Sequence, residues 1–520
     1  MTEKLKANPM IVSVAVSLAA FMEVLDTTIA NVALANIAGS LGATSNESTW
    51  VLTSYLVSNG IVLPLSGWLS RVFGRKNFFI LCILGFVFTS FLCGVSTSLG
   101  MLIVCRLFQG LTGGGLQPSQ QAIIKDAFPP SKLGMAFAIT GITTVIAPII
   151  GPVLGGYITD NFSWRWIFFI NIPVGLLAAF LVNLLVEDTV ESKKQAVGSI
   201  DYIGLGMIVI GLGALQIVLD KGQQEDWFGS NFIILFAAAS AIALIGAIIW
   251  LWEQKNPIID LKLFKNKSFS MACLMIFFVG VTLYSSAALM PMMVQSDFGY
   301  NATLSGFVLS PSGVTTILLM PVIGRLTGVI QAKYLICAGM LMNAFGMIMT
   351  GTISPQSDYE MFVFVRILQT LGLPFLFVPC GTLAFQKITA AHSSNASAVF
   401  SLMRNLGGSI GIALAASFVA RCQQINQAWL VDKLSYADAG YQAALSHYKA
   451  ALSNMGNYTA QNMALGKIYQ ELQHQASILA YRDTYHAIAV ILIVLAGIAL
   501  FMPKNITHTQ VSMSKKEAEN

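Results

Sequence analysis

Charged residues are scarce in this sequence. Asp, Glu, Lys and Arg together make up 10% of the 520 residues, and hydrophobic residues make up 55%. Soluble domains carry about 25% charged residues, so a soluble globular protein is excluded. The composition predicts an all-α polytopic membrane protein. The net charge of +5 does not indicate a nucleic-acid partner, because the positions of the charges are better explained by membrane topology.

Patterns typical of metal sites and disulfides are also missing. The five histidines are scattered singly, and the seven cysteines show no ligand-like spacing. Six cysteines fall within apolar runs, and Cys422 is expected alone at the end of a helix. We therefore predict no metal site and no disulfide framework.

Signatures of enzymes and channels are lacking as well. We find no P-loop, no aspartate-rich metal motif and no nucleophile motif, which argues against ATP hydrolysis and against a membrane-embedded lipid-modifying enzyme. The rings of charge or carbonyl loops of a channel filter are also not evident. Transport without a cofactor is the function class that remains favoured.

Long apolar runs are what the sequence does contain, and they predict fourteen membrane-spanning helices. The first run follows Lys4 and Lys6 and exceeds the length of a signal peptide's apolar region, so it is expected to stay as an uncleaved helix. The predicted spans are 10–37, 49–70, 77–97, 99–124, 133–158, 164–186, 200–219, 230–252, 268–296, 303–324, 333–353, 359–386, 394–420 and 478–503.

The distribution of Lys and Arg predicts the orientation of these spans. With an even number of spans, both termini lie on the same side. The segments on that side hold nineteen Lys and Arg residues, whereas the short loops on the other side hold two, Arg165 and Lys221. The positive-inside rule therefore places both termini in the cytoplasm.

The second half of the sequence repeats the first. A shift of 260 positions lays Arg106–Gln109 on Arg366–Gln369, and it lays Ala147, Gly151 and Gly155 on Gly407, Gly411 and Ala415. We predict a six-helix bundle over 1–190, two inserted spans and linkers over 191–264, and a second six-helix bundle over 265–520. Such repeats are typical of secondary transporters, which bind cargo between the halves.

Two acidic residues, Glu23 and Asp26, interrupt the first span near its middle. An ionised side chain there costs about 2.5–3.5 kcal/mol on insertion scales, so it is expected to face the protein interior or a water-filled path. The spacing i, i+3 places both on one helix face. A purely structural role in helix packing is the alternative.

Arg106 in the fourth span lies at a depth similar to that of Asp26, so the two are expected to approach each other. A buried acid beside a buried cation can switch by proton uptake. A structural tie is again the alternative, because Arg366 occupies the same place in the repeat. Since the shift of 260 carries Asp26 to Ser286, any proton chemistry belongs to the first half.

Small residues and prolines recur every four positions in the fifth span. Gly141 to Gly156 reads GITTVIAPIIGPVLGG, in which Gly151 and Gly155 continue one small-residue row, and Pro148, Pro152 and Gly156 form a second row. Small rows allow close helix contact, and the prolines favour a hinge or seal. A structural packing face would show the same pattern.

Three motifs carry a resemblance to a known family. LDTTIANVAL at Leu25–Leu34, RLFQGLTGG at Arg106–Gly114 and GPVLGG at Gly151–Gly156 resemble motifs of the major facilitator superfamily, in its fourteen-helix drug:proton antiporter branch. The resemblance covers nearly the whole chain. It implies proton transfer at the fourth-span motif and export, rather than uptake, from the fifth-span motif. GWLSRVFGRK at Gly67–Lys76 departs from the family's loop motif, because Arg71 and Val72 stand where Asp and Arg are usual.

A polar segment, 422–477, separates the last two spans and is predicted outside. Apolar residues at helical spacing on either side of Gly456–Asn457 predict a helical hairpin. The hairpin either packs on itself or docks a partner. The resemblance implies a periplasmic adaptor and an outer-membrane channel as partners, although related pumps without an adaptor remain an alternative.

Polar residues on apolar spans near the acids are the candidates for a cargo site. Adaptable apolar methionines beside them would suit varied amphipathic drugs. The candidates are Asn31, Tyr55, Asn59, Gln109, Gln117, Gln120, Gln121, Tyr284, Met293 and Gln295, with Met290 and Met292 in the same apolar wall.

These observations together predict a proton-coupled antiporter in the bacterial inner membrane. Asp26, with Glu23, is expected to take a proton from outside, release cargo outward and lose the proton inward. An exporter of a single metabolite without an adaptor is the closest alternative function.

Overall fold

A computed structural model describes residues 8–129, 132–187, 201–254, 257–434, 439–451 and 457–504, and these residues form helices and no strands. The helices are α1 (Pro9–Leu41), α2 (Ser45–Ser48), α3 (Trp50–Phe73), α4 (Arg75–Gly94), α5 (Leu99–Gly113), α6 (Leu116–Ala127), α7 (Leu133–Asn161), α8 (Trp166–Phe169), α9 (Asn171–Leu185), α10 (Tyr202–Lys221), η3 (Trp227–Gly229), α11 (Asn231–Glu253), η4 (Leu261–Lys265), α12 (Lys267–Ser296), α13 (Ala302–Leu326), α14 (Ala332–Thr350), α15 (Tyr359–Leu371), α16 (Leu373–Phe385), α17 (Ala390–Lys433), α18 (Ala439–Ala451) and α19 (Asn457–Ala499).

Thirteen segments of the described chain are long and apolar enough to cross a membrane. The helix α3 is a further one of spanning length, with 24 residues, but its buried side carries Ser58, Asn59 and Ser66 and is therefore less apolar. With α3 the count agrees with the predicted fourteen spans. The chain is a multi-pass membrane protein.

Three predicted spans are divided into two helices: 164–186, which breaks between α8 and α9, and two others that break at equivalent places in the repeat. The span predicted at 99–124 breaks at Gly114 and Gly115 between α5 and α6, and the span predicted at 359–386 breaks at Gly372 between α15 and α16. A Cβ atom at Gly114 would lie 2.6 Å from the carbonyl oxygen of Asn59 on α3. Close helix approach at these glycines explains the break, which the apolar pattern alone did not reveal.

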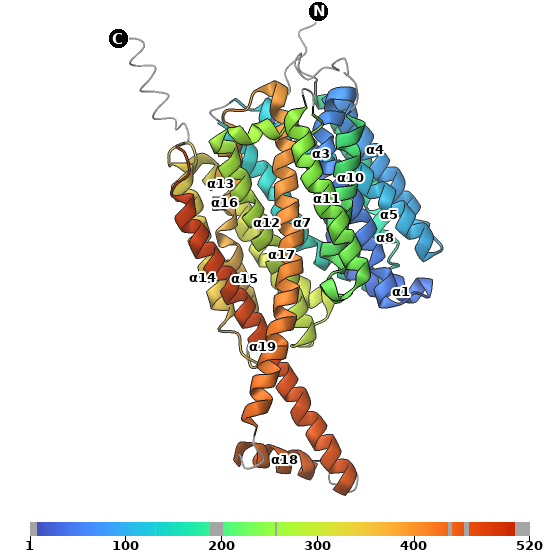
Figure 1. Ribbon diagram of the computed structural model, residues 1–520, viewed down its shortest axis with the longest axis vertical. Coiled ribbons are helices and arrows are strands. Elements are labelled where there is room, and N and C mark those ends of the chain that lie inside the picture. The colour runs from blue at the N-terminus through green and yellow to red at the C-terminus, as the bar shows by residue number, and fades with distance from the viewer. Residues whose placement is uncertain are drawn as a thin grey trace, which may run out of the picture.

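The two six-helix halves stand side by side, and the pair α10–α11 lies against them (Figure 1). α7 packs along α13, α3 along α17, and α6 also against α17, so these helices form the contact between the halves. α10 packs on α3, and Trp227 donates to Ser417 of α17 over 3.1 Å. The inserted pair therefore touches both halves.

α11 is covered on one side only. Its Ser240 hydroxyl donates to the Gly211 carbonyl of α10 over 2.9 Å, while Ile242, Ile245 and Ile249 are exposed. A row of exposed isoleucines on a spanning helix is expected to face lipid, since lipid tails are as apolar as these side chains.

A stalk projects from the bundle on the side opposite the C-terminal end of α19 (Figure 1). It consists of the ends of α17 and α19, with α18 lying across them. α17 has 44 residues, which corresponds to roughly 66 Å of helix and about twice the thickness of the bilayer core.

The predicted hairpin is therefore present, but its beginning is corrected. α17 continues without a break through Cys422 to Lys433, so Cys422 does not lie at a helix end. The apolar pattern of α17 weakens beyond Cys422 because the helix leaves the membrane there, although the helix itself continues. Gly456 of the predicted turn and the predicted domain boundary near residue 190 lie outside the described residues.

Candidate functional site

The Asp26 side chain of α1 is buried, and both of its carboxylate oxygens have polar partners. Its Oδ2 forms an ion pair with Arg106 Nη1 of α5. Its Oδ1 accepts from Gln109 Nε2 over 3.2 Å and from Asn171 Nδ2 over 2.8 Å. The side chains of Asp26 and Arg106 are 1% and 0% exposed, which makes this a fully desolvated pair. Two charges held in this way support each other, and removal of either leaves the other uncompensated.

Arg106 has partners on several helices of the first half. Its Nε donates to the Val51 carbonyl of α3 over 3.2 Å, and its Nη1 also donates to Gln109 Oε1 over 2.9 Å. The guanidinium carbon lies 4.2 Å from the centroid of the Tyr55 ring, a cation–π geometry. Arg106 thus connects α1, α3 and α5 around one carboxylate.

Glu23 lies one helical turn away from Asp26 and has different partners. Its carboxylate accepts from Tyr55 Oη over 3.2 Å, Asn59 Nδ2 over 3.0 Å and Gln117 Nε2 over 2.6 Å. Every one of these donors is a neutral group, and none of the ion pairs formed by the described residues includes Glu23. The two acids on one helix face are therefore chemically distinct.

Gln117 connects Glu23 to the other half of the protein. Its Oε1 accepts a hydrogen bond from Arg404 Nη2 of α17, while its Nε2 donates to Glu23. Arg404 is 1% exposed, and Tyr284 of α12 lies close enough to interact electrostatically with its guanidinium group. A chain of polar contacts thus runs from the acid on α1, through α6, to an arginine of the second half.

The sequence analysis missed Arg404 and Asn171. Each is a polar residue inside a predicted span, at 394–420 and 164–186, and this is the same signal that singled out Arg106. Asp220 was also not predicted, because it lies one residue past the predicted span 200–219; it falls within α10 and accepts from Thr53 of α3.

The small residues of α7 serve two interfaces. A Cβ atom at Gly155 would lie 3.2 Å from the Ile29 carbonyl oxygen of α1, and Thr28 Oγ1 lies 3.4 Å from the Ala147 carbonyl oxygen. On the other side, a Cβ atom at Gly156 would lie 3.0 Å from Thr303 of α13. α7 is therefore packed between the acid-bearing helix and the second half.

The remaining residues of the fifth-span pattern follow the same arrangement. Gly151 faces Thr28 of α1, and Gly141 faces Met320 of α13. Pro148 and Pro152 lie within one continuous helix, Leu133–Asn161. A hinge or seal at these prolines stays a prediction.

The predicted cargo residues fall into two groups. Tyr55, Asn59, Gln109 and Gln117 gather around the acids, as described above. Gln120 donates to Ser17 over 2.8 Å and to Thr143 over 3.2 Å within the first half, and Gln121 is buried beside it on α6. Tyr284 is half-buried next to Arg404. Of Gln120, Gln121 and Tyr284, only Tyr284 has an interaction with a member of the polar chain that joins the halves.

Other predicted cargo residues lie apart from this group. Asn31 and Gln295 are exposed, and Gln295 donates to Ser305 over 3.3 Å. Met290 and Met293 are buried in the core of the second half, whereas Met292 is 52% exposed. The three methionines therefore do not form one continuous wall, because they occupy different faces of α12.

A second contact between the halves lies near the end of α3. This end carries the loop motif Gly67–Lys76, which differs from the usual family motif. Arg75 forms an ion pair with Asp126, and its Nε and Nη2 donate to Ser394 and Ser393 of α17 over 3.2 Å and 3.1 Å. Ser393 also donates to Asp126 over 3.2 Å. Although the loop departs from the family motif at Arg71 and Val72, Arg75 still connects the halves on this side.

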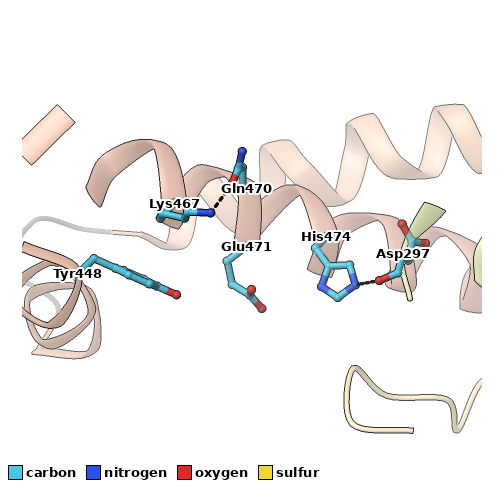
Figure 2. A pocket seen from close by; sticks show the side chains of 6 residues that line it. All are labelled: Asp297, Tyr448, Lys467, Gln470, Glu471 and His474. Atoms are coloured by element: carbon cyan, nitrogen blue, oxygen red, sulfur yellow. Dashed lines mark hydrogen bonds between the residues drawn. The ribbon is translucent and has the colours of Figure 1, made fainter. Parts of the chain in front are cut away.

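A polar pocket of about 490 Å³ lies where the stalk meets the bundle (Figure 2). Its lining includes Asp297, Tyr448, Lys467, Gln470, Glu471 and His474. His474 Nε2 lies 2.7 Å from the Asp297 carbonyl oxygen, and Ser477 donates to Asp297 Oδ2 over 2.9 Å. Burial raises the pKa of the Asp297 carboxyl above its usual value, although the Ser477 hydroxyl opposes that rise.

No group of three or more His, Cys, Asp or Glu side chains suited to a metal ion occurs among the described residues. The chemistry available at the two acids is instead the gain and loss of a proton, with rearrangement of the hydrogen bonds around them.

Comparisons with known proteins place this geometry in context. The family model described as Major Facilitator Superfamily matches residues 16–257 and 272–423. The chain is 35% identical over 496 residues to the multidrug export protein EmrB of Escherichia coli (strain K12), covering 95% of each. It is 37% identical over 426 residues to the protein of that name from Haemophilus influenzae, covering 82% of this chain and 83% of the relative.

Two further similarities extend the comparison. The chain is 32% identical to the fatty acid resistance protein FarB of Neisseria gonorrhoeae, covering 94% of each. The solved structure of the proton:xylose symporter XylE superposes with a TM-score of 0.61 at 13% identity, covering 96% of each chain. At that identity the superposition supports the fold alone.

Proposed function

Because this chain belongs to the major facilitator superfamily, we propose that it exports amphipathic drugs or other toxic hydrophobic compounds across the bacterial inner membrane in exchange for protons. Membership of this family makes the chain a transporter and not an enzyme, so the alternative of a lipid-modifying enzyme is wrong. Relatives with the names multidrug export protein and fatty acid resistance protein support an exported, largely apolar cargo.

The observation that carries proton coupling is the pair of acids on α1 with unlike surroundings. Asp26 is neutralised by Arg106, whereas Glu23 is held by three neutral donors. An ionised group buried without a cation in contact is unfavourable, so uptake of a proton there changes the local energy strongly. We assign the coupling proton to this pair, together with Arg106.

Protonation of Glu23 has a direct consequence for its partners. The new O–H needs an acceptor, while Tyr55, Asn59 and Gln117 all direct donors at the same carboxyl group. At least one of these contacts must rearrange. If Gln117 turns away, its hydrogen bond from Arg404 is lost, and one polar contact between α6 and α17 is removed. Proton uptake would in this way loosen the contact between the halves.

The proposed cycle follows from this link. A proton from outside neutralises the acid pair and favours the release of cargo outward, and loss of the proton inward restores the acceptors and prepares the site for new cargo. Proton uptake and cargo uptake then alternate, as antiport requires. We propose that no cofactor other than the proton gradient takes part.

The test is efflux driven by a pH gradient in liposomes that contain the purified protein. Glu23→Gln and Asp26→Asn are expected to insert and fold but to abolish gradient-driven drug efflux, because each keeps the shape of the side chain and removes its titration. Glu253→Gln, at an exposed acid of α11, is the matched control and should retain efflux. Full activity in both buried-acid variants would refute proton coupling at this site.

We also propose that the stalk docks a periplasmic adaptor, which would in turn join an outer-membrane channel. The stalk exposes Trp429, Val431, Met463 and Tyr469, and exposed apolar residues outside the membrane are candidates for a binding surface. In this proposal the stalk lies outside the inner membrane and both termini lie in the cytoplasm, as the distribution of Lys and Arg predicts.

The docking test is co-purification of a candidate periplasmic adaptor that is co-expressed with the full chain. Met463→Ser together with Tyr469→Ser should reduce recovery of the adaptor, while Val490→Ser, at an exposed position in the membrane part of α19, should not. Drug export that is fully independent of the adaptor would instead identify a stand-alone exporter.

A further inference from the structure

Arg366 of α15 is a buried arginine whose countercharge is missing among the described residues. It is fully buried, and its Nη1 donates to Ser286 over 3.1 Å and to Gln369 Oε1 over 3.0 Å. Its Nε and Nη2 have no hydrogen-bond acceptor in the described part of the chain. Neither an ion pair nor a cation–π contact of the described residues includes it.

The same position in the first half shows what is lacking. Arg106 Nη1 donates to Gln109, whose Nε2 reaches Ser90, and Arg366 Nη1 donates to Gln369, whose Nε2 reaches Thr350 over 2.7 Å. Each pair of equivalent residues is separated by 260 positions. The one exchange that alters charge is Ser286 in the place of Asp26, and Ser286 Oγ accepts where the carboxylate would.

The free edge of Arg366 has the geometry of an anion site. The Nε and Nη2 hydrogens lie on the same edge of the planar guanidinium and point in parallel, which suits a single anion or a bidentate carboxylate. The hydroxyl of Tyr485 on α19 is fully buried, has no partner in the described chain and lies within electrostatic reach of Arg366. Three donors thus remain unused around one charge.

A water molecule would satisfy these donors but would leave the charge. Arginine stays protonated in proteins, so the positive charge cannot be removed by loss of a proton. An uncompensated charge at this depth is strongly unfavourable, and buried charges are paired in general. Arg366 lies seven residues from the start of α15, which is about 10 Å along the helix.

We propose that the second half binds a small monovalent anion, such as chloride or a carboxylate group, between the Nε/Nη2 edge of Arg366 and the hydroxyl of Tyr485. This anion supplies the negative charge that Asp26 supplies in the first half. The protein would then carry one covalent and one exchangeable counterion, beside two equivalent arginines. The inference does not depend on proton coupling at Glu23 or Asp26.

The experiment measures the unfolding temperature of the purified full-length protein at constant sodium concentration, while methanesulfonate, a bulkier anion without a carboxylate, is replaced by chloride or by formate. A ligand that binds the folded state raises this temperature in a saturable manner. We expect such a rise for the wild type with chloride, with formate or with both. A response to formate alone also supports the site and identifies the ligand as a carboxylate.

Two variants separate this site from a general salt effect. Ser286→Asp should fold without an added anion and lose the response, because the new carboxylate pairs with Arg366 as Asp26 pairs with Arg106. Arg366→Met should lose the response because the charge is gone. Arg421→Gln, at an exposed arginine of α17, should respond like the wild type.

Direct binding provides the second measurement. Equilibrium dialysis of radiolabelled chloride, in competition with formate, should show one saturable class of site in the wild type. The proposal is overturned if the wild type neither binds nor responds to either anion, or if Ser286→Asp responds as the wild type does.

Discussion

Gln117 donates a 2.6 Å hydrogen bond to Glu23 and joins that acid of the first half to an arginine of the second half. Its other side-chain atom, Oε1, accepts from Arg404 of α17. One neutral amide thus connects a carboxylate and a guanidinium that make no ion pair with each other. Because an amide can turn, this link can respond to the protonation of Glu23 more readily than a direct ion pair could.

Replacement of Gln117 by leucine should uncouple the two halves. The substitution removes hydrogen bonds to two charged groups, each worth about 1.5–3 kcal/mol, which corresponds to roughly 10- to 100-fold per bond. We expect gradient-driven efflux to fall at least 10-fold. Gln424→Leu, at an exposed glutamine of α17, is the control. Equal effects of the two substitutions would contradict the proposed role of Gln117.

Loss of Arg106 should destabilise the protein strongly. Arg106→Met leaves Asp26 buried without its cation, which costs about 3–5 kcal/mol. The double variant Arg106→Met with Asp26→Asn should recover much of that stability without recovering transport. Thermal unfolding of the purified variants, analysed as a double-mutant cycle, measures the coupling between the two side chains. Additive effects would mean that the ion pair contributes no coupling energy.

A methyl group at Gly151 should disturb the contact between α7 and α1. A Cβ atom there would lie 2.7 Å from Thr28 Cβ, so the helices must shift apart. Overpacking of this kind costs about 1–3 kcal/mol, and the shift would also displace the helix that carries Glu23 and Asp26. Gly206→Ala on α10 has nothing within 4 Å of the added atom and should be neutral or stabilising. Unfolding temperature and efflux of both variants provide the check.

The contact between stalk and bundle should be stronger in acid than in alkali. The pKa of Asp297 is raised by burial, so the folded state binds its proton more tightly than the unfolded chain does. This contribution to stability is complete below the ordinary pKa of the group, 3.8, and is lost as the pH rises through the raised value. His474, Glu471 and Lys467 face the same pocket.

Hydrogen exchange of the stalk helices measures this dependence. Protection of the backbone amides around His474 and Ser477 of α19 should decrease from pH 4 upward in the wild type. Asp297→Asn should make protection less dependent on pH, because the amide keeps an acceptor for Ser477 but does not titrate. A wild type whose protection does not vary over this range would contradict the assignment to Asp297.

Much of the fold followed from local patterns. The fourteen spans and the internal repeat could be predicted because a bilayer demands about 20 apolar residues per helix, whatever the partners of that helix are. The approach of Asp26 to Arg106 was also predicted, since two unlike charges at one depth in an apolar bundle have few other ways to be compensated.

The partners of each acid could not be derived in this way. Glu23 and Asp26 share a helix face, and only the packing of α3, α5, α6 and α9 decided that one meets an arginine and the other neutral donors. The breaks at Gly114 and Gly372 and the unbroken course of α17 past Cys422 likewise depend on what lies next to the helix.

The sequence by itself thus determined how many times the chain crosses the membrane and which half carries the two acids. It also determined that the second half has Ser286 at the position equivalent to Asp26. The tertiary structure alone decided that Arg404 reaches across to Gln117 and that Arg366 has two donors without an acceptor. Periodicity reports which way a side chain points from its own helix, whereas the neighbour it meets depends on contacts between helices far apart in the chain.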